Sequence, residues 1–316
     1  SNLNMDTSKG LENIDGVVWF DGRYVDWKDA KVHVLTHTLH YGLGVFEGVR
    51  AYSTMQGPTI FRLKDHTDRL FESADTVKLK IPYSKDEINK AQIEVVKRNK
   101  LEEAYIRPMC FYGSEGLGLR ADNLKVHCIV AAWYWPSYLS PELYEKGIKV
   151  KLSSYTRQRG NKVSRSKVNG NYVNSIVALN EALEAGFDEA LMLDTEGNVA
   201  EGSGENFFMV KDGKIFTPDV EASLNGITRK SIIDLAKNEK IDVIEKNISP
   251  EEVIQADELF FTGTAAEVLP ITFVDKNKIS NGQRGPITEI LQSKYSNHVR
   301  GKHILFPEWL TNISDN

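Results

Sequence analysis

Lys167 is the residue of this chain around which chemistry could be arranged. It lies in the polar, glycine-containing stretch 164–172, which follows a strand-like run at 148–153. Apolar residues spaced as in a helix come next, between Ser175 and Glu184. A lysine at a strand–loop–helix junction can reach into a cleft while its neighbours stay on rigid elements. A lysine taken alone is usually solvated, so this interpretation depends on the residues that accompany it.

Two glycine-containing turns further along the chain could bind an anion. Gly226-Ile227-Thr228 begins a predicted helix, where unpaired N–H groups and the positive end of the helix dipole favour an anion. Gly263-Thr264-Ala265 follows a predicted strand, and its small residues let backbone N–H groups approach a ligand. Glycine before a helix is also ordinary turn chemistry. Arg69 could complete an anion site or could lie on a solvated helix face.

Glu201 is bracketed by small residues, which suits a buried carboxylate beside a cation, although a glutamate in a β-turn is the alternative. Together with Lys167, Tyr172 and the two turns, it completes the set that a phosphorylated pyridoxal cofactor requires. The lysine would form a Schiff base with the aldehyde, and the turns would hold the phosphate. The carboxylate would keep the ring nitrogen protonated, so that the ring accepts electrons.

Composition predicts a cytoplasmic globular protein with two domains. The chain has 316 residues, of which 41% are hydrophobic and 26% charged, as in ordinary globular proteins. Its net charge of −5 does not favour nucleic acid as a partner. The longest apolar run, 128–135, is too short to span a bilayer, and no signal sequence opens the chain. Cys110 and Cys128 lack metal-binding spacing, so we expect reduced core cysteines and no metal site.

The patterning divides the chain into a flexible tail (1–15), a small N-terminal domain (16–134), a linker (135–145) and a C-terminal domain (146–316). In the first domain we expect a hairpin, two helices and further strands. The hairpin comprises 17–20 and 24–27, and the further strands are 59–62, 105–111 and 126–133. One helix is capped by Asp65, and the other covers 86–97. In the second domain we expect strands at 148–153, 190–193, 207–210, 214–216, 241–245 and 258–261, and helices at 175–184, from 224–229 to about 237, from 250 and from 286.

Seven segments carry a more specific signal because of their order along residues 16–310. They are His40-Tyr41-Gly42 with Val45-Phe46-Glu47-Gly48, His66 to Leu70, Ala104 to Pro108, Lys167 to Tyr172, Glu201-Gly202 with Gly204-Glu205-Asn206, Gly226 to Arg229, and Gly263 to Glu267. In this set the chain resembles the branched-chain amino acid aminotransferases, which are class IV aminotransferases of pyridoxal-phosphate fold-type IV. The resemblance implies an α/β fold with a smaller N-terminal α/β domain and a larger C-terminal pseudo-barrel domain. It also implies pyridoxal 5′-phosphate as cofactor, amino acids and 2-oxo acids as substrates, and a homodimer or dimer-based hexamer.

The resemblance assigns roles to individual residues. Lys167 would be the Schiff-base lysine and proton carrier, Tyr172 would bind the phenolic oxygen, Glu201 the pyridine nitrogen, and Leu224 would pack on the ring. The phosphate would be held by Arg69, Ile227, Thr228 and Thr264. The side-chain pocket would be lined by Phe46, Gly48, Trp135 and Tyr138. The substrate α-carboxylate would face Tyr105 and the turn containing Thr264, Ala265 and Ala266, the distal carboxylate of glutamate would face Arg107, and Tyr41 and Leu119 would come from a partner subunit.

Two departures and three alternatives accompany this assignment. Leu119-Arg120-Ala121 stands where bacterial relatives often have valine-asparagine-proline, and Pro136 replaces a common glycine. A D-amino acid aminotransferase or an aminodeoxychorismate lyase would share the fold, but 105–107 and 263–267 favour the branched-chain enzyme. A catalytically silent protein that binds a phosphoryl ligand is the third alternative, against which an intact Lys167 argues, together with Tyr172 and Glu201.

Overall fold

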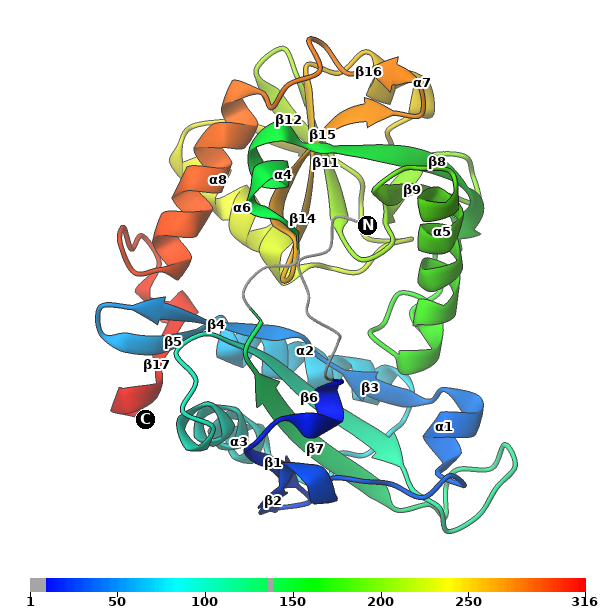
Figure 1. Cartoon of the computed structure of the whole chain (residues 1–316). Helices are drawn as coiled ribbons and strands as arrows, with labels where there is room; N and C mark the ends of the chain where they lie inside the picture. The colour runs from blue at the N-terminus through cyan, green and yellow to red at the C-terminus, as the bar shows by residue number, and fades with distance from the viewer. Residues whose placement is uncertain (1–9, 136–138) are drawn as a thin grey trace. The chain divides into compact units, whose positions relative to one another are not determined.

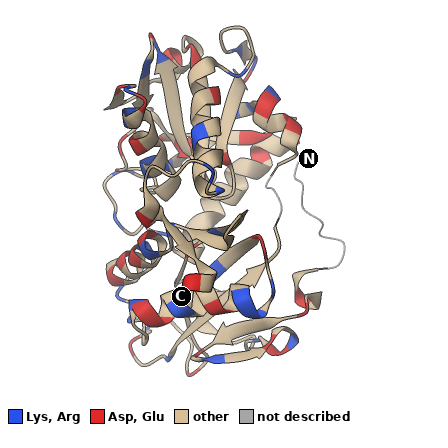
Figure 2. Ribbon diagram, turned by 90° about the vertical axis from the view of Figure 1, so that its left-hand side faces the viewer, with Lys and Arg blue, Asp and Glu red and all other residues tan. Residues whose placement is uncertain are grey.

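The computed structural model describes residues 10–135 and 139–316, which form two compact units that interleave along the chain (Figure 1). The N-terminal unit contains 10–135, 166–171 and 299–316. The barrel unit contains 139–165 and 172–298. Basic and acidic residues are interspersed along the ribbons of both units in the view of Figure 2. Within the described residues, no helix has both the length and the apolarity needed to cross a bilayer.

The N-terminal unit is built on an antiparallel sheet in the order β17-β5-β4-β6-β7-β1-β2, with β3 also paired to β6. Its strands are β1 (Val17–Phe20), β2 (Arg23–Asp26), β3 (Gly44–Phe46), β4 (Val49–Thr54), β5 (Gly57–Phe61), β6 (Ala104–Tyr112), β7 (Val126–Trp133) and β17 (Leu310–Asn312). Its α-helices are α1 (His37–Tyr41), α2 (Leu63–Thr76) and α3 (Lys85–Arg98). The edge strand β17, red in Figure 1, therefore comes from a segment far along the chain from its neighbour β5.

The helices of this unit begin where local side chains can satisfy backbone donors. Ser84 accepts from the N–H of Glu87, whose side chain accepts in return from the N–H of Ser84, so a capping box starts α3. The prediction that Asp65 caps α2 is wrong. Arg62 is the capping residue, in the left-handed conformation, and Asp65 lies in the first helical turn, where it accepts from Arg62 Nε at 2.7 Å. A carboxylate there is favoured by the positive end of the helix dipole without capping the helix.

Alternation along β6 and β7 separates the two faces of this sheet. Ile106 and Cys110 belong to the core that the sheet shares with α2 and α3. Arg107 and Met109 belong to the other face, since successive side chains of a strand point to opposite sides. Residues of this second face are therefore available for a site.

The barrel unit contains a closed ring of strands in the order β10-β9-β8-β15-β14-β11, which the pairing of β10 with β11 closes. The strands of the unit are β8 (Ile148–Arg157), β9 (Glu189–Asp194), β10 (Val199–Gly202), β11 (Asn206–Lys211), β12 (Lys214–Thr217), β13 (Val243–Glu245), β14 (Glu258–Gly263), β15 (Glu267–Val274) and β16 (Asn277–Lys278). Its helices are α4 (Pro141–Lys146), α5 (Tyr172–Glu184), α6 (Ile227–Asn238), α7 (Pro250–Ile254) and α8 (Pro286–Val299). A closed barrel in one unit and a smaller α/β sheet in the other is the fold class that the sequence predicts.

Two apolar clusters define the inside and outside of the barrel. Leu191, Phe207 and Phe261 belong to the large interior cluster. Ala190 and Met192 pack instead with alanines of α5 on the outer side. Directly paired residues of neighbouring strands point to the same side, so the partner of Met192 on β10, which is Glu201, points toward α5.

Most expected elements are present, together with several that were not expected. Among the additions are the short strand 199–202, the strand 267–274, the helix 141–146 and the edge strand 310–312. Strand 267–274 contains a proline and starts at a glutamate with φ of 58°, and both features weaken the usual pattern of a strand. In the segment expected to be a tail, residues 11–13 form a 3₁₀ turn whose Leu11 carbonyl accepts from Trp27 Nε1 at 2.7 Å.

Candidate active site

Lys167 is held by backbone contacts within the N-terminal unit. Val168 forms a β-bridge with Val45, and the Lys167 carbonyl accepts from the N–H of Phe46 at 3.3 Å. The N–H of Lys167 lies 3.3 Å from Ser73 Oγ of α2. The segment 166–171 thus packs with the N-terminal unit although the residues on either side of it belong to the barrel unit.

The ring of Phe46 lies close to two cations. Lys167 Nζ is 4.7 Å from the ring centroid, and the guanidinium carbon of Arg107 is 4.6 Å from it. Arg107 Nε donates to the carbonyl of Glu47 at 2.8 Å, and Arg107 Nη2 donates to the Tyr105 hydroxyl at 3.0 Å. The Phe46 ring therefore lies next to both the predicted catalytic lysine and Arg107, and Arg107 in turn contacts Tyr105.

Gly48 and Trp135 complete this group of predicted substrate residues. A Cβ at Gly48 would overlap the Tyr105 hydroxyl, so only glycine allows the tyrosine side chain to lie against the backbone at this position. The Trp135 ring packs edge-on against the Tyr105 ring at a centroid distance of 4.5 Å. Tyr138, and the departure at Pro136, lie outside the described residues.

Arg69 forms a buried ion pair that the sequence interpretation did not include. Its Nε and Nη2 each donate to a different oxygen of the Glu47 carboxylate at 2.8 Å, and His66 Nδ1 lies 2.7 Å from Glu47 Oε1. Burial alone would raise the pKa of Glu47, but the charge of Arg69 and the hydrogen bonds from His66 and Arg69 lower it to about 2. Burial lowers the pKa of His66, so the imidazole is neutral and donates to Glu47. The role of Arg69 toward a phosphate stays a prediction.

Glu201 of β10 is a buried acidic residue that lies beside an arginine. Its Oε2 accepts from the N–H of Leu224 at 3.1 Å, and its Oε1 lies 3.6 Å from Arg157 Nη2. Arg157 Nη2 is closer to Ser175 Oγ, at 2.5 Å, and also reaches the carbonyl of Ser203 at 3.4 Å. Sequence reasoning missed Arg157, because the end of β8 gives no signal that its side chain reaches β10.

The start of α6 has the features of an anion site. Gly226 precedes the helix, and no side chain caps it, while Ile227 and Thr228 in its first turn are buried. A Cβ at Gly226 would overlap Asn206 Oδ1, and Asn206 Nδ2 donates to the Leu224 carbonyl at 2.9 Å. Asn206 therefore holds the approach to the helix, a role that the sequence motif did not reveal.

The predicted turn after β14 and the start of α5 supply the other residues. Gly263 ends β14, where a Cβ would be 3.3 Å from the carbonyl of Gly204. Thr264 and Ala265 follow, and Ala266 is buried. Tyr172 is the first residue of α5. A helix start without a side-chain cap and a buried carboxylate beside an arginine fit the phosphate and the ring nitrogen of pyridoxal phosphate.

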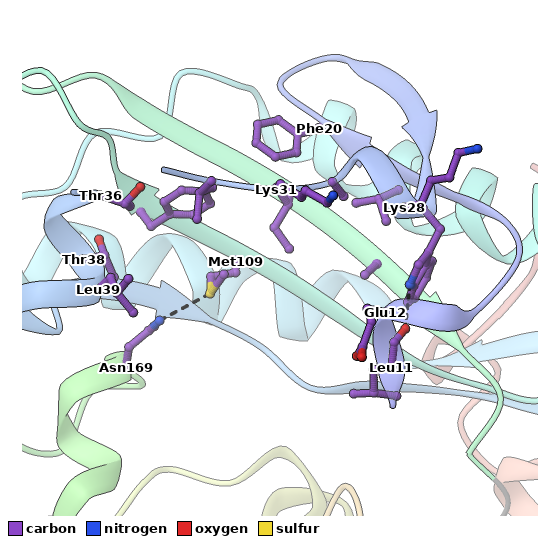
Figure 3. Close-up of a pocket in the computed structure, with 17 residues that line it drawn as sticks. Leu11, Glu12, Phe20, Lys28, Lys31, Thr36, Thr38, Leu39, Met109 and Asn169 are labelled. Carbon is purple, nitrogen blue, oxygen red and sulfur yellow. Dashed lines mark hydrogen bonds between the residues drawn. The ribbon is translucent and has the colours of Figure 1, made fainter. Parts of the chain in front are cut away.

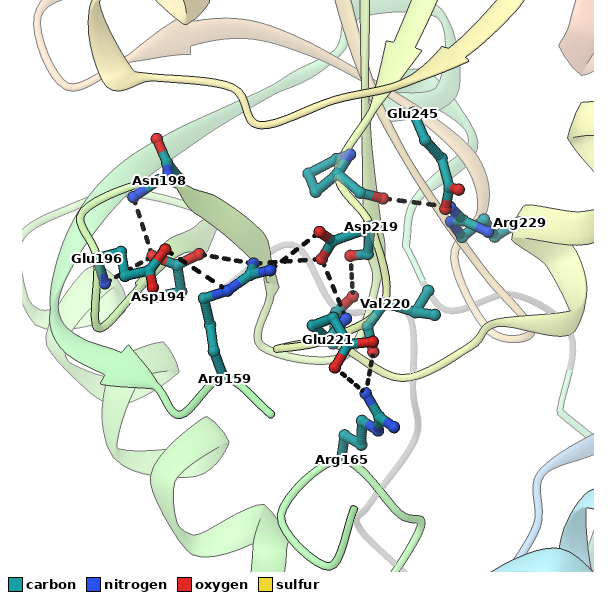
Figure 4. A network of polar contacts seen from close by, with 12 residues as sticks. Arg159, Arg165, Asp194, Glu196, Asn198, Asp219, Val220, Glu221, Arg229 and Glu245 are labelled. Atoms are coloured by element: carbon teal, nitrogen blue, oxygen red, sulfur yellow. Dashed lines mark hydrogen bonds and ion pairs between the residues drawn. The ribbon is translucent and has the colours of Figure 1, made fainter. Parts of the chain in front are cut away.

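An arginine network fastens the chain that leads to Lys167 (Figure 4). Arg159 forms ion pairs with Asp194 at 3.2 Å and Asp219 at 3.0 Å, and its hydrogen bond to Asp219 raises the pKa of its guanidinium. Arg165 pairs with Glu221 at 2.7 Å. The loop 159–165 is thereby tied to two turns of the barrel unit before the chain enters 166–171.

The N-terminal unit also carries an exposed apolar surface. Tyr41 is 46% exposed and Leu119 is 84% exposed, and a hydrogen bond of 2.6 Å between His37 Nε2 and the Gly118 carbonyl joins their segments. Other large apolar residues that are exposed in these segments are Val32, Val34, Leu35, Leu39 and Leu117. A mostly apolar pocket of about 580 Å³ lies beside them on the second face of the sheet, with Leu39 and Met109 in its wall (Figure 3).

Comparison with known proteins gives consistent matches. Residues 44–274 match the family model of amino-transferase class IV. The branched-chain-amino-acid aminotransferase of Pseudomonas aeruginosa is 59% identical over 298 residues, covering 94% of this chain and 97% of that protein. The crystal structure of the Escherichia coli branched-chain amino acid aminotransferase has a TM-score of 0.92 at 40% identity, covering 95% of this chain and 99% of that one. The branched-chain amino acid aminotransferase of Thermobaculum terrenum, solved in its PLP-bound holo form, has a TM-score of 0.87 at 32% identity, with the same coverage.

Proposed function

This chain belongs to the class IV aminotransferase family, and from that premise we propose that it is a branched-chain amino acid aminotransferase. It transfers the amino group between leucine, isoleucine or valine and 2-oxoglutarate. The observation that carries the proposal is the group formed by Lys167, Phe46 and Arg107, in which one apolar ring lies beside both a lysine and an arginine. We also place the enzyme in the cytoplasm, where its two buried, free cysteines stay reduced.

Pyridoxal 5′-phosphate supplies, when bound, an aldehyde that exchanges amino groups and a ring that accepts electrons. Lys167 holds the cofactor and moves a proton at the substrate Cα. Glu201, which lies beside Arg157 and accepts from the Leu224 N–H, pairs with the ring nitrogen. The remaining cofactor contacts come from Tyr172 to the phenolic oxygen, from Leu224 to the ring, and from Arg69, Ile227, Thr228 and Thr264 to the phosphate.

One pocket must accept both an apolar side chain and a second carboxylate. Phe46, Gly48, Trp135 and Tyr138 provide the apolar lining, and Tyr105 with Ala265 and Ala266 binds the α-carboxylate. Arg107 receives the distal carboxylate of glutamate, because a guanidinium can grip a carboxylate with paired hydrogen bonds. When leucine is bound, the contacts of Arg107 with Tyr105 and the Glu47 carbonyl keep its charge partnered.

Arg107→Met tests this division. We expect the glutamate and 2-oxoglutarate half-reactions to lose ~10-fold or more in kcat/KM, with a much smaller loss for leucine. Arg107→Lys, which keeps a cation without the fork, is the matched control and should retain part of the glutamate activity. Equal losses for both substrates with a lower melting temperature would show that Arg107 is only structural.

A second experiment separates the enzyme from the alternatives. Lys167→Ala should lower turnover of leucine by ~10²–10⁴-fold or more, and should abolish the visible absorption band that borohydride removes from the wild-type protein. A panel of L- and D-amino acids separates a D-amino acid aminotransferase from the proposed enzyme. A phosphoryl-binding protein without activity would show neither the band nor turnover.

The protein forms a homodimer, or a hexamer built from dimers, in which Tyr41 and Leu119 of one subunit approach the site of its partner. The exposed apolar residues of 32–41 and 117–119 and the neighbouring apolar pocket support this proposal, because monomeric proteins seldom leave so much apolar surface in water. Val34→Asp should shift the sedimentation coefficient to that of a monomer. Met55→Asp, at a fully exposed position elsewhere on the unit, is the control and should leave the assembly unchanged.

A further inference from the structure

Two glutamate side chains meet inside the barrel unit, and neither has a role in the function above. Glu189 is the first residue of β9, and Glu205 immediately precedes β11. Both residues are more than nine-tenths buried, at 3% and 6% exposed, and their side chains are hydrogen-bonded to each other. A Cβ at Gly202 would overlap Glu205 Oε2 and lie 2.9 Å from the Phe261 ring, so the Glu205 carboxyl packs tightly over the backbone of β10.

A hydrogen bond between two carboxyl groups requires a proton on one of them, because an ionised carboxylate only accepts. Each glutamate already accepts from a backbone N–H, at 2.7 Å from Ala190 to Glu189 and 3.2 Å from Gly204 to Glu205. Among residues 10–135 and 139–316, no lysine, arginine or histidine forms an ion pair with either one. Two unpaired charges in contact inside a core would be very costly, so the pair holds one proton.

The surroundings assign the proton to Glu205. Two side chains act on the Glu205 carboxyl, Glu189 of β9 and Glu201 of β10, and both are acidic. The Gly204 N–H acts on it as well, by donating a hydrogen bond. Burial, followed by the charge of Glu189 and the hydrogen bond to it, raises the pKa of Glu205 well above its ordinary value. The arginine beside Glu201 is Arg157, and its guanidinium contacts Ser175 and Glu201.

Glu205 also lies against the turn that follows β14. A Cβ at Gly263 would be 3.3 Å from the Gly204 carbonyl and 3.7 Å from Glu205 Cγ. The turn beginning at Gly263 contains Thr264, Ala265 and Ala266, which by the proposed function bind a phosphate and a carboxylate. A negative charge on Glu205 would oppose both anions, whereas a neutral acid would not.

We propose that Glu205 is a positioning residue that remains a neutral acid at working pH, carrying the proton of the Glu189–Glu205 pair, and so keeps negative charge away from the anion-binding turn at 263–266. The anion-binding part of this proposal rests on the proposed function, whereas the shared proton does not.

The first experiment measures the melting temperature of Glu205→Gln and wild type from pH 5 to pH 9, with and without pyridoxal phosphate. Glutamine keeps a donor to Glu189 and cannot ionise. Because the folded pKa of Glu205 is raised, wild type loses stability as pH rises from about 4.5 toward that folded value. The melting temperature of the variant relative to wild type should therefore increase with pH, by ~2–4 °C for each pH unit.

Glu258→Gln is the matched control, since Glu258 is equally buried but accepts from Thr288 N, Thr288 Oγ1 and Ile287 N at 2.8–3.2 Å. A glutamine at this position would place its NH₂ group against N–H and O–H donors, so the melting temperature of Glu258→Gln should fall at every pH in the range. If Glu205→Gln behaves like Glu258→Gln, Glu205 is ionised and the proposal is wrong. A pH-independent difference between Glu205→Gln and wild type overturns it equally.

A second experiment measures the dissociation constant of pyridoxal 5′-phosphate at pH 7 for wild type and Glu205→Gln. A neutral acid and a neutral amide place the same charge beside the turn, so the two affinities should agree to within about twofold. Binding that is ~10-fold tighter in Glu205→Gln would mean that wild type carries a negative charge there, and would overturn the proposal. If the melting difference depends on pH but the protein does not transaminate leucine, the shared proton is supported and the proposed function is wrong.

Discussion

Glu47 in the N-terminal unit and Glu205 in the barrel unit are both buried glutamates, yet Glu47 is ionised and, by our proposal, Glu205 is neutral. Glu47 faces the guanidinium of Arg69 and the imidazole of His66, and its pKa falls to about 2. Glu205 faces another glutamate, and its pKa rises. Burial penalises the charged form in both places, so the partner side chain decides the charge.

The largest effect should come from removing the charge in the N-terminal unit. Glu47→Gln leaves the Arg69 guanidinium buried without its carboxylate, which typically costs ~3–5 kcal/mol. Urea unfolding of this variant beside Glu205→Gln tests the contrast, since the second substitution removes no charge at neutral pH. Comparable losses in the two variants would mean that burial outweighs the partner.

Acid should remove the same contribution gradually. The pKa of Glu47 is lowered in the folded state, so its stabilisation is complete above the ordinary value near 4.5 and disappears as pH falls toward 2. The shift corresponds to ~3 kcal/mol. His66 acts in the same direction, because its lowered pKa means that protonation below its ordinary value opposes folding. Stability curves of wild type and Glu47→Gln should converge on acidification, and parallel curves would contradict the assignment.

Glu201 lies between the two cases, with a cation 3.6 Å away that has a closer neutral partner. Glu201→Gln keeps the shape but cannot stabilise a protonated ring nitrogen, so each half-reaction should lose at least ~1.5–3 kcal/mol of transition-state stabilisation. Stopped-flow absorbance with leucine measures this. Cofactor affinity should change little, and unchanged half-reaction rates would exclude the role.

The smallest effect is expected at Ser175, whose hydroxyl accepts from Arg157. Ser175→Ala should lower the free energy of unfolding by only ~1 kcal/mol, because Arg157 can turn toward Glu201. Chemical denaturation checks this value, and Ser53→Ala, at an exposed position of β4, serves as its control. A loss as large as that of Glu47→Gln would show that Ser175 supports more than one hydrogen bond.

The sequence predicted the elements and the residues with chemical character better than their partners. Periodicity located α3 to within one residue at each end, and the ordered motifs led to the family. The Asp65 cap failed because the helix starts three residues earlier than a cap at Asp65 would place it. Predicted roles such as that of Tyr172 remain predictions.

What could not be predicted depends on distance along the chain. Glu47 and Glu205 each stand beside glycine in the sequence, and nothing local separates an ionised glutamate from a neutral one. Arg69 reaches Glu47 across 22 positions, and Glu189 of β9 meets Glu205, which precedes β11. Charge state is thus a property of tertiary pairing, which the pattern of one segment does not contain.

The pairing of β17 with β5 has a consequence for synthesis on the ribosome. Leu310 lies opposite Phe61, so the edge of β5 gains this partner only after the whole barrel unit has emerged. Until then, the nascent chain presents an unpaired strand edge next to a nearly complete sheet, which is the kind of edge that recruits other chains. Vectorial folding of the N-terminal unit is therefore open to aggregation until residues 310–312 have emerged, and chaperones that shield strand edges would act on this protein during that interval.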